Sequence, residues 1–241
     1  MKKIKKKKIA YIINHASFFY SHILPIALEA KKKYDISLFH GLFGSLQMEK
    51  YAIRKIKKLK LDTKKVEILP ASTNIFREFL GFLDLYNSLK NFKPDLIHCA
   101  TPKGILYGGI LSRLLNTKSL IIFNTGMGFL FTNKLNIFER LAKHFYISVL
   151  KNFILKHKNK KIIIENKDDF KFFIKKFNLK KRDVVLIKGS GVNINKLKKI
   201  SINKNQTVLM PARVVKEKGV IEFTKASTNL KKKFPKWNFV V

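Results

Sequence analysis

The sequence predicts an α/β protein built around a parallel sheet. Short runs rich in Ile and Val alternate with amphipathic segments of helix length, which is the pattern of successive β-α-β units. Runs such as "SLIIFN" and "KIIIEN" contain consecutive apolar residues, as expected when helices cover both faces of a sheet. With 241 residues, 46% of them hydrophobic, the chain can form one large domain, or one domain and part of another.

A complete Rossmann-like domain is expected over residues 1–188. Its expected strands are 9–14, 34–40, 66–70, 95–100, 119–124, 161–166 and 184–188. Its expected helices lie near 20–33, 46–60, 74–92, 103–115, 135–157 and 167–177. In such folds ligands bind beyond the carboxyl ends of the strands, where polar and glycine-rich loops such as "HCATPKG" and "NTGMGFLFTNK" follow here.

A polar, lysine-rich stretch at 189–206 predicts a hinge between two domains. After it, "TVLMPA" predicts a strand, 220–233 a helix and "WNFVV" another strand. We interpret 207–241 as the first β-α-β unit of a second Rossmann-like domain. One such unit cannot bury both faces of its strands, so we expect this domain to be incomplete.

The chain is strongly basic, with 51 Lys and Arg against 15 Asp and Glu and a net charge of +36. A bias toward Lys, Ile, Asn and Phe accounts for part of the excess, because only six of the basic residues are Arg. The remainder favours an anionic partner: a phosphorylated substrate, an anionic lipid surface or nucleic acid. We expect no nucleic-acid partner, because no recognised binding motif is present and the lysines are spread throughout.

Cys99 is the single cysteine, so no intrachain disulfide can form, which suits a cytoplasmic protein. The six histidines form no helical pair, and we expect no metal site and no cofactor. The basic start followed by apolar residues is similar to a secretory signal, but polar residues at 14–17 interrupt it, and a first strand is favoured. No run of eighteen apolar residues predicts a transmembrane helix.

The segment "PARVVKEKGVIEFTKA" (211–226) has the composition of a phosphate clamp. Arg213 and Lys218 stand five residues apart in a loop, and Gly219 begins the helix that follows. Free N–H groups at a helix start, a guanidinium fork and an ammonium group all suit phosphate oxygens. The alternative is that a lysine-rich chain places cations in every loop.

Four residues of the first domain are candidates for binding a ligand beyond the carboxyl ends of the strands. Thr125, Gly126 and Gly128 belong to the loop "NTGMGFLFTNK", where glycines let the backbone approach a ligand. Lys103 precedes a helix at the end of a strand and could meet a diphosphate. The alternatives are a tight turn with packed aromatic residues and a solvated lysine.

Three further features have two interpretations each. His98 is either a packed strand residue or a polar participant, and Asn166 and Asp169 are better explained as helix caps than as catalytic groups. The segment 136–157 has a broad apolar stripe. A helix facing the core is the default, and a helix lying at a membrane surface is the alternative.

Six segments in order resemble retaining glycosyltransferases of family 4. They are "SFFYSHILPIALEAKKKYDISL", "DLIHCATPKGILYGGILSRL" with "IFNTGMGFLFT", "IENKDDFKFFI", "IKGSGVN" and "PARVVKEKGVIEFTKA". The resemblance implies the two-domain GT-B fold, with Arg213, Lys218 and Gly219 against the donor diphosphate and no metal. It also places the loop candidates on the acceptor side: Lys103, Thr125, Gly126 and Gly128. It implies transfer from a nucleotide sugar, UDP-hexose or UDP-N-acetylhexosamine, to a polyprenyl-diphosphate-linked glycan in surface polysaccharide synthesis. Such an enzyme is expected to be peripheral, on the anionic inner face of the membrane.

The chain departs from this family in one respect. The family's downstream Glu-x7-Glu motif, which engages the donor sugar and the ribose, does not occur before Val241. The catalytic residues are therefore unknown, and we expect a C-terminally truncated chain that is inactive by itself. The alternative is a non-catalytic remnant that binds a membrane or a partner, and less probable still is a basic nucleic-acid-binding protein.

Overall fold

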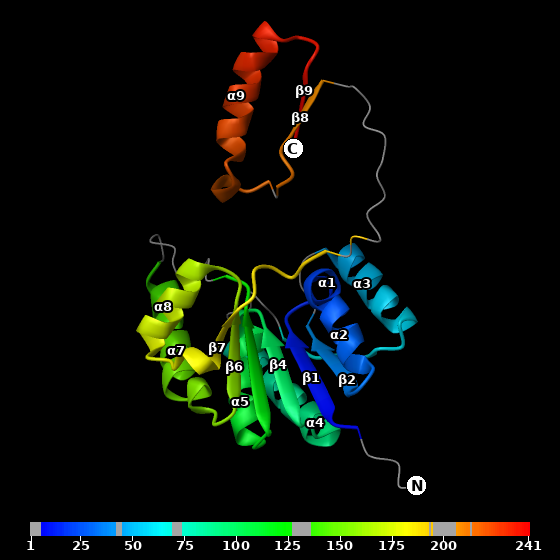
Figure 1. Ribbon diagram of the computed structural model, residues 1–241, viewed down its shortest axis with the longest axis vertical. Coiled ribbons are helices and arrows are strands. Elements are labelled where there is room, and N and C mark those ends of the chain that lie inside the picture. The colour runs from blue at the N-terminus through cyan, green and yellow to red at the C-terminus, as the bar shows by residue number, and fades with distance from the viewer. Residues whose placement is uncertain are drawn as a thin grey trace. The chain divides into compact units, whose positions relative to one another are not determined.

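The chain forms two compact units, Met1–Gly191 and Val192–Val241 (Figure 1). The computed structural model describes residues 6–41, 45–68, 74–126, 136–192, 194, 206–212 and 214–241.

The first unit contains a seven-stranded, all-parallel sheet in the order β3-β2-β1-β4-β5-β6-β7. Its strands are β1 (Lys8–Ile13), β2 (Asp35–His40), β3 (Asp62–Lys65), β4 (Leu96–Ala100), β5 (Ser119–Asn124), β6 (Lys160–Ile164) and β7 (Val184–Leu186). The predicted α/β class with a parallel Rossmann-like sheet is confirmed. The strand order reverses between β1 and β4, which lie next to each other.

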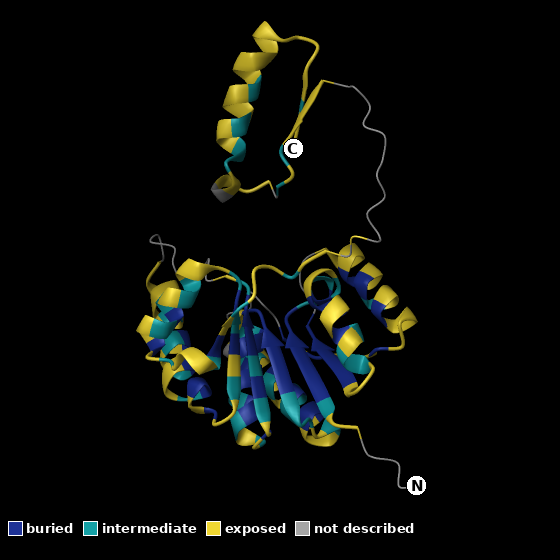
Figure 2. Ribbon diagram, in the orientation of Figure 1, coloured by how far each residue is buried: buried dark blue, intermediate teal, exposed yellow. Residues whose placement is uncertain are grey.

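Helices pack on both faces of this sheet. They are α1 (Ala16–Phe18), α2 (Leu24–Lys31), α3 (Leu46–Lys58), α4 (Ile75–Phe92), α5 (Pro102–Leu114), α7 (Ile137–Asn152) and α8 (Lys167–Phe177). Alternate residues of β1 serve the two faces: Ile12 packs in one core cluster with α4, α5, α7 and α8, and Tyr11 packs in the other with α1, α2 and α3. The central strands are accordingly buried (Figure 2).

The expected helix at 20–33 starts earlier, at Ala16, and contains a π-helical turn at Phe19–Ile23. Pro25 follows this turn and has no N–H to continue the regular ladder, which explains the local change of helix type. The carboxylate of Glu49, buried on α3, accepts hydrogen bonds from the N–H groups of Ala16 and Ser17 at 2.8 and 3.1 Å. A distant carboxylate therefore caps the first helix, and no local pattern indicates it.

The strand expected at 66–70 is wrong. The strand is instead Asp62–Lys65, a polar segment at the edge of the sheet that pairs with β2 alone. Val66 and Ile68 follow it and are buried in the core. At this edge of the sheet the paired residues are polar, and the apolar residues that follow them pack in the core. The prediction followed the apolar residues and therefore placed the strand too far along the chain.

The second unit contains two parallel strands, β8 (Thr207–Leu209) and β9 (Asn238–Val240), connected through α9 (Val220–Lys233). The expected β-α-β unit is confirmed. Every residue of α9 is described, and each is exposed or half-buried. The rings of Phe223 and Phe239 lie 6.4 Å apart and join the helix to β9.

Candidate active site

The reversal of strand order between β1 and β4 defines the candidate site. The chain leaves these two neighbouring strands toward opposite faces of the sheet, so a crevice opens between their carboxyl ends. Asn14 follows β1, and Thr101 with Lys103 follows β4 at the start of α5.

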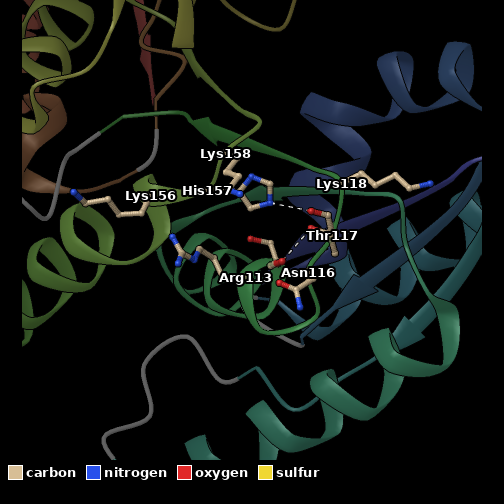
Figure 3. Close-up of a pocket in the computed structure, with 8 residues that line it drawn as sticks. Arg113, Asn116, Thr117, Lys118, Lys156, His157 and Lys158 are labelled. Atoms are coloured by element: carbon tan, nitrogen blue, oxygen red, sulfur yellow. Dashed lines mark hydrogen bonds between the residues drawn. The ribbon is translucent and has the colours of Figure 1, made fainter.

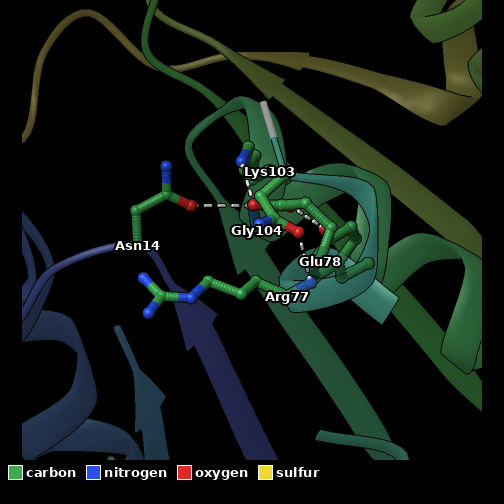
Figure 4. A network of polar contacts seen from close by, with 7 residues as sticks. Asn14, Arg77, Glu78, Lys103 and Gly104 are labelled. Carbon is green, nitrogen blue, oxygen red and sulfur yellow. Dashed lines mark hydrogen bonds and ion pairs between the residues drawn. The ribbon is translucent and has the colours of Figure 1, made fainter. Parts of the chain in front are cut away.

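Asn14 connects the two sides of this crevice (Figure 4). Its side-chain oxygen accepts a hydrogen bond from the N–H of Gly104 at 3.0 Å, and its own N–H donates to Thr101 Oγ1 at 3.2 Å. Gly104 allows this close approach, because a Cβ there would lie 2.8 Å from the carbonyl oxygen of Ile12. Thr101 has a φ of 68°, an uncommon backbone for a β-branched residue, and such residues cluster at functional sites.

Lys103 lies at the same edge and pairs with α4. Its ammonium group is 2.7 Å from Glu78 Oε1, and both side chains are about four-fifths buried. The hydroxyl of Tyr107, one turn further along α5, donates to the other oxygen of Glu78. Burial, and then the Glu78 carboxylate, raise the pKa of Tyr107, so the phenol stays protonated.

Arg77 stands beside Glu78 in the first turn of α4, and its side chain is exposed. In Figure 4 its guanidinium extends away from Glu78, toward the side where Asn14 lies. The crevice thus has a cation from each of two helix starts, Arg77 and Lys103. The sequence reasoning did not single out Asn14, Arg77 or Glu78, because their importance arises from contacts between distant segments.

Thr125 and Gly126 follow β5 at this same edge of the sheet. Gly126 is exposed with a φ of 130°, and an added Cβ would meet nothing within 4 Å, so the backbone rather than packing calls for glycine there. Asn124, just before them, is buried, and its Nδ2 has no hydrogen-bond partner in the described part of the chain. Gly128 lies outside the described residues.

His98 lies in the interior of β4 rather than in the crevice. Its ring packs between those of Tyr11 and Phe123, with centroids at 4.9 and 6.2 Å. Burial lowers the pKa of His98 to about 4, so the ring is neutral at pH 7. Of its two interpretations, the packed strand residue agrees with the structure.

Asn166 caps α8, because its side-chain oxygen accepts a hydrogen bond from the N–H of Asp169 at 2.8 Å. This is the capping role expected for Asn166, whereas the carboxylate of Asp169 accepts a hydrogen bond from Asn166 Nδ2 at 2.8 Å and caps no backbone N–H in the described residues.

The candidate phosphate clamp belongs to the second unit. Lys218 is exposed in a short 3₁₀ turn (Lys216–Lys218), and Gly219 is the N-cap residue of α9 with a φ of 79°, a conformation that favours glycine. Arg213 lies outside the described residues, so the structure describes one cation of the pair and the glycine.

The profile of the family described as "Glycosyl transferase 4-like" matches residues 8–189. The chain belongs to this glycosyl transferase 4-like family. The match includes the crevice residues Asn14, Glu78 and Lys103 together with Thr125 and Gly126. Residues 213, 218 and 219 lie beyond it.

A curated relative of this glycosyl transferase 4-like protein comes from Campylobacter jejuni subsp. jejuni. It is N,N'-diacetylbacillosaminyl-diphospho-undecaprenol alpha-1,3-N-acetylgalactosaminyltransferase, which is 25% identical over 248 residues. The alignment covers 97% of this chain and 62% of the relative, so the chain spans less than two thirds of the relative's length.

Two solved structures illustrate the shared fold. UDP-GlcNAc 2-epimerase from Neisseria meningitidis, bound to UDP-GlcNAc, aligns with a TM-score of 0.60 at 14% identity, over 97% of this chain and 64% of that one. The lipopolysaccharide outer core galactosyltransferase WaaB aligns with a TM-score of 0.54 at 12% identity, over 90% and 57%. At these identities the likeness concerns the fold alone, and it agrees with the expected GT-B type.

A cavity of about 370 Å³ lies away from the crevice, where α5 ends (Figure 3). It is lined by Ser112, Arg113, Asn116, Thr117, Lys118, Lys156, His157 and Lys158. The N–H of Asn159 donates to His157 Nδ1 at 3.2 Å, so His157 Nε2 carries the proton that reaches the Thr117 carbonyl at 3.1 Å. His157 is thus hydrogen-bonded through both ring nitrogens. The cavity lies at the edge of the sheet opposite the carboxyl ends of the strands.

None of the described helices is long and apolar enough to cross a membrane. Within the same residues, no group of three or more His, Cys, Asp or Glu side chains is placed to hold a metal ion.

Proposed function

We propose that the whole protein is a glycosyltransferase that moves a sugar from a nucleotide-sugar donor to a polyprenyl-diphosphate-linked glycan, in the synthesis of a surface polysaccharide. The proposed donor is UDP-hexose or UDP-N-acetylhexosamine. The observation that carries the proposal is the family match over 8–189 together with the Campylobacter relative, whose name specifies a diphospho-undecaprenol substrate.

In this proposal each of the two units binds one of the two substrates. Residues 1–188 take the acceptor, residues 189–206 act as the hinge, and 207–241 begin the donor domain. The acceptor diphosphate binds to Lys103 and the N-terminal end of α5. The backbone at Thr125, Gly126 and Gly128 contacts the glycan. The position of Lys103 at the switch point of the sheet supports this assignment, because ligands of open α/β sheets bind there.

Arg213, Lys218 and Gly219 are proposed to hold the donor diphosphate. The acceptor oxygen bonds to the anomeric carbon as the bond from that carbon to the diphosphate oxygen breaks, and the hydroxyl proton passes to the leaving diphosphate or to water. Negative charge then grows on the leaving nucleoside diphosphate, where the two cations and the N–H groups that start α9 stabilise it. The exposed position of Lys218 leaves its ammonium group accessible to a phosphate.

The proposed place of action is the cytoplasmic face of an anionic membrane. A lipid-linked acceptor is held in the bilayer, so the enzyme must reach the headgroup region. The net charge of +36 favours such a surface, where each nearby cation contributes about 1 kcal/mol.

Binding of UDP, measured by calorimetry on the full chain, tests the donor site. We expect weak binding that falls at least tenfold in Arg213→Ala/Lys218→Ala, and unchanged binding in the control Lys225→Ala/Lys231→Ala, which removes two cations from α9. If the first double variant binds UDP as the parent protein does, the donor-site assignment is wrong. Equal losses in both variants would mean that bulk charge, rather than a clamp, holds the nucleotide.

A further inference from the structure

Two helices present apolar side chains to solvent. On α4 the exposed residues follow helical spacing at Phe76, Phe79, Leu80 and Leu83, and on α7 they are Ile137, Phe138, Leu141 and Phe145. Each of these eight side chains belongs to a residue that is between 37% and 78% exposed. We call them the apolar edge.

On each helix these residues form one stripe. At 3.6 residues per turn, each set of four falls within an arc of about 100°. The core residues Leu85 and Leu89 of α4, and Tyr146 and Leu150 of α7, fall on the opposite side of their helices. Each helix therefore has a second apolar face that the described residues of this unit leave exposed.

The two stripes belong to the same layer and begin at the same edge of the sheet. Both helices flank α5: Glu78 of α4 binds Lys103, the ring of Phe82 lies 5.6 Å from that of Tyr107, and α7 contacts α5 directly. Both helices also follow the carboxyl ends of parallel strands, so their starts lie on the side of the sheet that holds the crevice. The apolar edge thus flanks the proposed acceptor site.

A cation lies at the margin of each stripe, and Asp84, a carboxylate at the margin of the α4 stripe, lies 4.0 Å from the ammonium group of Lys64. By helical spacing, Arg77 lies at the margin of the α4 stripe, and Arg140 lies at the margin of the α7 stripe. The carboxylates in the first turns are engaged internally: Glu78 binds Lys103 and Tyr107, and Glu139 accepts a hydrogen bond from the N–H of Asn136 at 2.9 Å. Apolar residues with cations at their margins match the interface of an anionic bilayer, where the apolar groups enter the acyl boundary and the cations meet phosphates.

We propose that the apolar edge of α4 and α7 docks this protein on an anionic lipid bilayer, with the crevice at Lys103 held next to the headgroups. This inference rests on the proposed function, since it explains how the site reaches a lipid-linked acceptor. It revises the default interpretation of α7 as a helix that only faces the core: Tyr146 and Leu150 face the core, and Phe138 and Phe145 face the lipid.

Sedimentation of the full chain with vesicles, without any nucleotide sugar, tests the docking. The vesicles contain phosphatidylglycerol and phosphatidylethanolamine, or phosphatidylcholine alone. We expect binding to the anionic vesicles to weaken at least tenfold in Phe76→Ser/Phe138→Ser, one change on each helix. The matched control Leu59→Ser/Leu114→Ser removes two exposed apolar side chains near the C-terminal ends of α3 and α5, and its binding is expected to match the parent protein.

Three other results overturn the docking proposal. Equal binding of both variants means that general charge holds the protein to lipid, and equal binding to phosphatidylcholine removes the role of the anionic headgroup. If Phe76→Ser/Phe138→Ser abolishes self-association in light scattering but leaves vesicle binding unchanged, a second copy of the chain covers the edge. A protein that binds vesicles through this edge but does not bind UDP contradicts the proposed function and leaves the docking intact.

Discussion

The side-chain oxygen of Asn14 accepts a hydrogen bond from the N–H of Gly104 at 3.0 Å, across the point where the strand order reverses. The bond joins the end of β1 to the first turn of α5, and so holds the two walls of the crevice together. Both residues are buried, which makes the contact part of the scaffold that positions Lys103.

Replacing Asn14 with alanine is expected to lower the free energy of unfolding by about 1–3 kcal/mol, because the N–H of Gly104 is left buried without an acceptor. Asn166→Ala is the matched control. It removes another asparagine oxygen that caps a helix, at an exposed position, and is expected to cost about 1 kcal/mol. Urea unfolding of both variants measures the difference. Equal losses would show that the contact across the crevice is no more important than an ordinary cap.

Replacing Lys103 with methionine is expected to weaken binding of geranylgeranyl diphosphate at least tenfold, because a charge-assisted hydrogen bond to phosphate contributes about 1.5–3 kcal/mol. Lys118→Met is the control: Lys118 also pairs with a carboxylate, Asp95, at 2.8 Å, but outside the crevice. Calorimetric titration measures both affinities, and the control is expected to bind as the parent protein does.

The Lys103 variant also leaves Glu78 without its cation, which could repel the diphosphate by itself. Glu78→Gln/Lys103→Met removes that carboxylate charge. If this double variant binds as tightly as the parent protein, Lys103 serves only to neutralise Glu78 and makes no contact with the ligand.

The sequence predicts the parts of this fold that depend on local pattern. Six of the seven predicted strands of the first domain coincide with observed ones, because their apolar residues both pair and pack. β3 was missed since it is a polar edge strand, where pairing and burial fall on different residues. At the candidate site, the strand-end rule predicted that Lys103 and Thr125 lie at the carboxyl edge of the sheet, where the structure has them. Glu78 precedes Lys103 by 25 residues, and only the folded chain brings them together.

Replacing Gly81 with alanine is expected to destabilise the protein by about 1–3 kcal/mol, although alanine favours a helix. An added Cβ would lie 2.0 Å from the carbonyl oxygen of Glu67. Because this atom belongs to the backbone, it cannot move aside as the end of a flexible side chain could. Asn87→Ala, at an exposed position of the same helix, isolates the gain in helix propensity and is expected to be neutral or slightly stabilising. Thermal unfolding of both variants tests this, and a stabilised Gly81→Ala would mean that α4 does not approach Glu67.

His98 is expected to make stability fall at acid pH. Burial lowers the pKa of His98 from 6.5 to about 4, so between these values the unfolded chain binds a proton that the folded protein does not. Stability due to the neutral ring is therefore complete above pH 6.5 and is lost as the pH falls toward 4, by about 3 kcal/mol in all. Burial also lowers the pKa of His15, His40 and His157, and these residues add to the loss in the same direction.

His98→Phe keeps an aromatic ring between Tyr11 and Phe123 and removes the titrating group. Urea unfolding between pH 4 and pH 7 is expected to show a shallower decline of stability for this variant than for the parent protein. The remaining slope in His98→Phe measures the contribution of the other buried histidines. If His98→Phe declines as steeply as the parent protein, the folded state takes up a proton at His98 above pH 4, and the ring is less well shielded from water than its packing between two aromatic rings indicates.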